Sequence, residues 1–132
     1  MSTLSKVDPS TLGWVKTEID ETLKQARLAL EAYAENTADD SKLRFCATYL
    51  HQVLGTLQMV ELDGAAMLAR ETEALASAIL NGQATSGPAA IETLIRGILT
   101  LPDYLARLQV GQPDSPLRVF SLLNELRTAR GE

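Results

Sequence analysis

The stretch that decides the fold is Cys46-Ala47-Thr48-Tyr49-Leu50-His51-Gln52-Val53-Leu54-Gly55-Thr56-Leu57, followed by Leu62-Asp63-Gly64-Ala65-Ala66-Met67-Leu68. Apolar residues recur here every three or four positions, which is the spacing of one face of an α-helix. These residues are Leu43, Ala47, Leu50, Val53, Leu54, Leu57 and Val60. The single histidine, His51, lies about 100° around the helix from Leu50, so we expect its imidazole to reach water at the edge of the buried face.

Similar apolar seams on both sides predict further helices. The expected helices cover about 12–35, about 42–61, a segment from Asp63-Gly64 to Asn81-Gly82, a segment from Pro88 to about Leu108, and a last one from Ser115-Pro116. A proline inside a helix removes a backbone hydrogen bond, so Pro102 predicts a kink or a break near Leu101. The short link at residues 62–64 predicts an antiparallel hairpin of the second and third helices.

The predicted fold is therefore all-α, an antiparallel four-helix bundle with an additional C-terminal helix. Residues 1–11 are expected to be a flexible amino terminus, residues 12–110 the bundle, and residues 111–132 a helix that packs on the bundle or leads to a following domain. The expected seam of the last helix is Leu117, Phe120, Leu123 and Leu126, with Arg118, Arg127 and Arg130 outside. Trp14 lies off the first seam, and we expect it to close one end of the bundle rather than anchor a partner.

Composition excludes several kinds of function. The chain has 132 residues, is 45% hydrophobic, and carries a net charge of −5 without a basic cluster, which argues against a nucleic-acid partner. Its single cysteine and single histidine predict no disulfide and no metal site, and they fit a reducing cytoplasm. No apolar segment reaches the roughly 18 residues that a membrane span needs, so direct membrane insertion is not expected. No glycine-rich phosphate loop follows a strand, so no cofactor is expected.

A glycine follows the histidine one helical turn later, at Gly55. Glycine inside a helix costs about 1 kcal/mol relative to alanine, and its absent side chain clears the surface beside the imidazole. His51 and Gly55 match the His-x-x-Lys-Gly motif, so the chain resembles histidine phosphotransfer domains. Three segments narrow the resemblance to the amino-terminal region of the chemosensory hybrid histidine kinases that control type IV pili and twitching motility, and to their shorter scaffold relatives. These segments are Trp14-Val15-Lys16, Glu21-Thr22-Leu23-Lys24-Gln25-Ala26-Arg27, and Tyr49 through Glu61.

The resemblance implies that His51 accepts a phosphoryl group in a two-component phosphorelay and that Glu73, at the matching place one helix later, orients the imidazole. The family's lysine, three residues after the histidine, is Leu54 in this chain. An ammonium there pairs with phosphoryl oxygens, so its replacement favours a second reading, a degenerate docking or scaffold module that is not phosphorylated.

Five residues follow one another at three or four positions on the predicted second helix and should form a surface that faces a partner. They are Arg44, Thr48, His51, Gly55 and Gln58. The resemblance implies that the partners are response-regulator receiver and kinase domains, or scaffold proteins of pilus signalling. It also implies that the ATP-dependent kinase chemistry lies in another domain, beyond Glu132, since this segment carries no catalytic constellation of its own.

Overall fold

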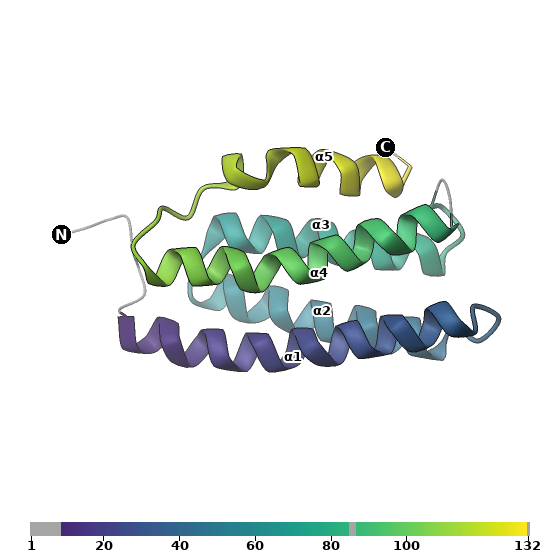
Figure 1. Cartoon of the computed structure of the whole chain (residues 1–132), viewed down its shortest axis with the longest axis horizontal. Coiled ribbons are helices and arrows are strands. Elements are labelled where there is room, and N and C mark those ends of the chain that lie inside the picture. The colour runs from purple at the N-terminus through teal and green to yellow at the C-terminus, as the bar shows by residue number, and fades with distance from the viewer. Residues whose placement is uncertain (1–8, 85–86, 132) are drawn as a thin grey trace.

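The computed structural model describes residues 9–84 and 87–131, and it is helical throughout with short connections (Figure 1). The elements are α1 (Pro9–Glu35), α2 (Ser41–Met59), α3 (Asp63–Leu80), α4 (Gly87–Gln109), the 3₁₀ turn η1 (Pro116–Val119) and α5 (Phe120–Ala129). The described residues contain no strand, and the predicted all-α bundle with an added C-terminal helix is confirmed.

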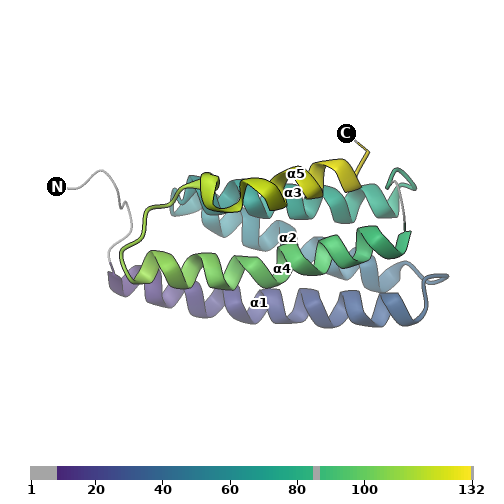
Figure 2. The ribbon, with the colours of Figure 1, turned by 45° about the horizontal axis from the view of Figure 1, so that its top comes forward.

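The first four helices form an antiparallel ring. α1 packs on α2 and α4, and α3 packs on the same two helices from the other side. α5 then lies over α3 and α4, away from α1 and α2, as both views of the ribbon show (Figures 1 and 2). α2 therefore contacts only α1 and α3 among the described elements, and its outer side stays uncovered.

The ends of α2 and α3 have hydrogen bonds that stop each helix at a defined residue. At the end of α2, the Leu62 N–H donates to the Leu57 carbonyl (3.0 Å) and Glu61 adopts a left-handed φ of 61°. At the end of α3, the Gln83 N–H donates to the Ala78 carbonyl (2.8 Å), with Gly82 at a φ of 73°. Both are Schellman motifs, which satisfy carbonyls of the last turn and reverse the chain.

The predicted seams of the first four helices lie in the core, which contains all of the large fully buried side chains. On α2, the buried residues are Leu43, Cys46, Leu50, Val53, Leu54 and Leu57, while Ala47 and Val60 are partly buried. The periodicity did not assign Cys46 to the seam. Desolvation in the core raises the pKa of its thiol to about 12.

The prediction for the last helix is wrong in its first half. Leu123 and Leu126 are buried, but Leu117 is 79% exposed and Phe120 is 55% exposed. Leu117 lies in the 3₁₀ turn of residues 116–119, which has three residues per turn and is out of phase with the α-helix that follows. Phe120 begins α5 and lies about 120° around that helix from Leu126, at the edge of its buried face. The Ser115 hydroxyl accepts a hydrogen bond from the Leu117 N–H and starts this turn.

The structure also bears on three smaller expectations. Trp14 is 67% exposed and does not close the end of the bundle. Pro102 lies inside α4, which continues to Gln109, so the expected break is absent there, and the expected kink stays a prediction. The buried side chains of Leu101 and Leu105, on either side of the proline, hold the two parts of the helix against the same core. Residues 9–11 belong to α1, and the remaining part of the expected flexible terminus, residues 1–8, lies outside the described residues.

Polar contacts fix α5 and its connection to the bundle. The carboxylate of Glu71 on α3 is 9% exposed and pairs with Arg130 (2.9 Å) and Arg127 (3.3 Å) of α5, so these two arginines are not simply external. The Asp114 carboxylate accepts hydrogen bonds from the backbone N–H groups of Gly64 and Ala65, each at 2.9 Å. It therefore caps the amino end of α3 from the segment that follows α4.

Candidate functional site

His51 lies on the open side of α2, beside a carboxylate of α3. Its side chain is 74% exposed, and Nδ1 is 3.1 Å from Oε2 and 3.3 Å from Oε1 of Glu73. Glu73 itself is only 23% exposed, so the packing of α3 holds its carboxylate in place. A carboxylate that accepts a hydrogen bond from Nδ1–H fixes the ring and leaves Nε2 as the nitrogen with a free lone pair.

The residue three positions after His51 points into the core. Leu54 is 8% exposed and belongs to the main hydrophobic cluster. A lysine at this position could pair with a phosphoryl group only by withdrawing its stem from the core and reaching around the helix edge. In the structure a carboxylate thus lies beside His51, while a buried leucine occupies the position where phosphotransfer domains carry lysine.

The expected partner-facing residues lie together along α2. Arg44, Thr48, His51, Gly55 and Gln58 are all exposed. A methyl group added at Gly55 would have no neighbour within 4 Å, so this position is open space in the free chain. The packing of the described residues therefore does not require a glycine at this position, and its role in partner contact stays a prediction.

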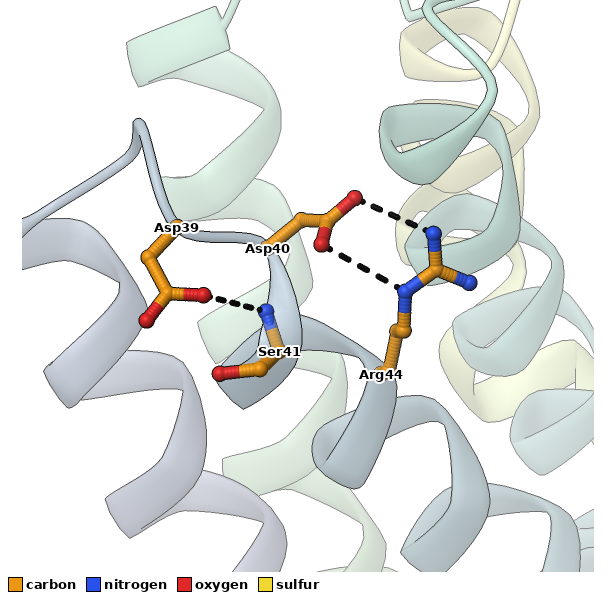
Figure 3. Close-up of polar contacts among 4 residues, drawn as sticks. All are labelled: Asp39, Asp40, Ser41 and Arg44. Carbon is orange, nitrogen blue, oxygen red and sulfur yellow. Dashed lines mark hydrogen bonds and ion pairs between the residues drawn. The ribbon is translucent and has the colours of Figure 1, made fainter.

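The amino end of α2 is held by its own charges (Figure 3). The Asp39 carboxylate accepts a hydrogen bond from the Ser41 N–H (3.0 Å), which lowers the pKa of Asp39 below its ordinary value, with smaller contributions from the Ser41 hydroxyl and Lys42. Asp40 instead pairs with Arg44 one turn later (3.2 Å). Asp39 therefore satisfies a backbone N–H at the start of α2, while Asp40 partly neutralises one end of the exposed stripe.

An exposed aromatic side chain on the same helix did not enter the predicted site. Phe45 is 52% exposed, and the Lys42 ammonium lies 5.6 Å from its ring centroid. The signal was present in the sequence, because Phe45 falls on the side of the helix opposite Leu43 and Leu50. Met59 lies on that side too and is 82% exposed.

Other kinds of site find no support in the part of the chain that the structure describes. The His, Cys, Asp and Glu side chains form no group of three that could hold a metal ion. The described helices include none that is both long enough and apolar enough to span a bilayer. The chemistry available on α2 is thus one oriented imidazole next to a surface open to a partner.

Comparisons with known proteins found a matching family and a scaffold protein of similar sequence. A family model described as the FimL C-terminal domain matches residues 10–122. The scaffold protein FimL of Pseudomonas aeruginosa is 29% identical over 123 residues, which are 93% of this chain and 22% of that protein. The chain thus spans about a fifth of the length of the curated relative it matches. No solved structure matches the chain. The expected likeness to scaffold relatives is confirmed, and the likeness to hybrid histidine kinases stays a prediction.

Proposed function

Since the chain belongs to the FimL C-terminal domain family, we propose that it is a docking module of pilus signalling that binds a partner through α2 without carrying phosphate. The matching relative is itself described as a scaffold protein, which supports a role in assembly rather than in catalysis. The proposed binding surface is the exposed stripe of α2 around His51, with Gly55 as the point of closest approach.

The burial of Leu54 carries this proposal. A phosphoryl group on an exposed histidine gains stability from a nearby cation, and a charge-assisted hydrogen bond of this kind is worth about 1.5–3 kcal/mol. In this chain the corresponding side chain is apolar and 8% exposed. The exposed residues that a partner would contact are present on α2. The position from which a lysine would stabilise a phosphorylated histidine is occupied by a buried leucine.

Partner binding and phosphate incorporation test the proposal together. The receiver domains and scaffold proteins of the same pilus system are immobilised one at a time, and the wild-type chain, Gly55→Leu and His51→Gln are passed over each. Docking by close approach predicts that Gly55→Leu weakens binding, because four extra heavy atoms stand at the contact point. His51→Gln should keep most of the affinity, since the glutamine amide preserves a polar side chain there. Equal affinities for wild type and Gly55→Leu toward every component would overturn the proposed surface.

A phosphoryl carrier is the second candidate, and the contact between His51 and Glu73 favours it. With Nδ1–H held by the carboxylate, Nε2 would attack a phosphoryl donor and then pass the group to a receiver aspartate. Acid-labile phosphate that appears on the wild-type chain, disappears in His51→Gln and slows in Glu73→Gln would establish this function. Phosphate absent from both the wild-type chain and Leu54→Lys, together with partner binding that survives His51→Gln, would leave docking as the function.

A further inference from the structure

The most outward-facing residues of α2 form a ridge that shares Thr48 and Gly55 with the stripe around His51 but runs from Phe45 to Met59. The ridge consists of Phe45, Thr48, Gln52, Gly55 and Met59, which alternate at three and four residues and are all exposed. At about 100° per residue, this set lies opposite the buried seam of α2, whereas His51 is turned toward α3. Apolar side chains stand at both ends of the ridge, 52% exposed at Phe45 and 82% exposed at Met59.

We propose that this ridge pairs with the same ridge of a second copy of the chain, with the two α2 helices antiparallel around a two-fold axis at Gln52. An alternation of three and four residues is the spacing of a helix–helix seam in a coiled coil. Because no other described element covers the outer side of α2, the ridge is open along its whole length of about 21 Å.

The ridge complements itself in the antiparallel orientation. Phe45 and Met59 each lie seven residues from Gln52, so the aromatic ring of one copy meets the thioether of the other, a favourable contact. Gln52 faces Gln52, and two carboxamides can donate to and accept from each other. An isologous contact of this kind uses one surface on both copies and closes after two chains.

Charge also favours the antiparallel orientation. At the amino end of α2, Lys42 and Arg44 balance Asp39 and Asp40, while Glu61 and Asp63 make the carboxyl end negative. Antiparallel pairing brings the balanced end of one copy, with Lys42, near the acidic end of the other, twice by symmetry. Parallel pairing would place the two acidic ends beside each other, which opposes association.

The contact is small, and this sets the expected affinity. One helix ridge against another falls short of the roughly 800 Å² per partner of a standard stable interface, so the dimer should be weak, with a dissociation constant on the order of 100 μM. The dimer would cover the surface beside His51. If the proposed docking function holds, partner binding and self-association therefore compete for α2.

Sedimentation equilibrium tests self-association without any partner, so its outcome is independent of the docking proposal. Between about 5 μM and about 1 mM, the mean mass of the wild-type chain should rise from monomer toward dimer. Gln52→Glu, which places two carboxylates at the axis, should keep the chain monomeric. Leu117→Glu is the control, because it adds the same negative charge at an exposed position on another surface. A wild-type chain that stays monomeric at about 1 mM, or self-association unaffected by Gln52→Glu, would overturn the proposal.

Disulfide trapping tests the register and the direction. In a Cys46→Ser background, Gln52→Cys should form a disulfide-linked dimer on mild oxidation. Thr48→Cys and Thr56→Cys should cross-link when mixed and only poorly when alone, because each lies four residues from Gln52 on opposite sides. Cross-linking of Thr48→Cys with itself would indicate a parallel pair, and that result would refute the proposed arrangement. Circular dichroism on each variant checks that the bundle is folded.

Discussion

Replacing Leu54 with lysine is the most informative single change, because it places at a buried position the cation that histidine phosphotransfer domains carry. Leu54 is 8% exposed within the main cluster of α2. Burial of a leucine side chain contributes about 1.5–3 kcal/mol, and an ammonium confined to the same place would add a desolvation cost. The lysine stem reduces that cost by leading the charge toward the edge near His51, so we expect a loss of about 2–4 kcal/mol in the free energy of unfolding.

Urea unfolding followed by circular dichroism measures this loss. With a denaturant slope of about 2 kcal/mol per molar, the midpoint of Leu54→Lys should fall by roughly 1–2 M. Gln58→Lys, on the exposed side of the same helix, should change stability by less than about 0.5 kcal/mol and serves as the control. A variant Leu54→Lys as stable as the control would mean that residue 54 is free to present a cation beside His51, and the structural argument against phosphorylation would fail.

Further predictions test the packing around α3 and α2. Gly64→Ala should destabilise the protein by about 2 kcal/mol or more in the same urea assay, because the added carbon would lie 2.6 Å from a carboxylate oxygen of Asp114. Gly55→Ala, whose added carbon meets open space, should stabilise the protein by up to about 1 kcal/mol. Asp114→Ala removes the cap of α3 and should lower the free energy of unfolding by about 1–2 kcal/mol. Glu71→Ala should increase amide hydrogen exchange throughout α5, because two arginines lose their carboxylate partner. Unchanged exchange would show that apolar contacts alone hold α5. The Cys46 thiol, whose pKa is raised by burial, should react with a thiol reagent at neutral pH only after unfolding, and rapid reaction of the folded chain would contradict its buried position.

Local sequence patterns predicted most of the bundle because its helices satisfy local rules. The seam of α2 and the end of α3 at Asn81-Gly82 follow from apolar spacing and from the left-handed conformation that glycine adopts at helix ends. The contact of His51 with Glu73 joins residues 22 apart, and only the family resemblance indicated it.

The features that the sequence did not predict depend on tertiary contacts. Glu71 and Arg130 are 59 residues apart, and Asp114 caps Gly64 from 50 residues away, so no helical periodicity connects these partners. The exposure of Leu117 depends on a single 3₁₀ turn, which changes the phase of the pattern without changing its composition. Cooperative packing also keeps α4 continuous through Pro102, against a local cost of about 3 kcal/mol.

The most direct test of the docking account is the affinity of the chain for the immobilised proteins of the pilus signalling system, compared between wild type, Gly55→Leu and His51→Gln. Both substitutions lie on the exposed side of α2, so the folded bundle should be retained in each. The account predicts that the wild-type chain binds at least one component and that His51→Gln binds the same component almost as tightly. Gly55→Leu should bind that component at least tenfold more weakly, equivalent to about 1.4 kcal/mol. Binding that depends on phosphate at His51 and is indifferent to the side chain at Gly55 would contradict the account.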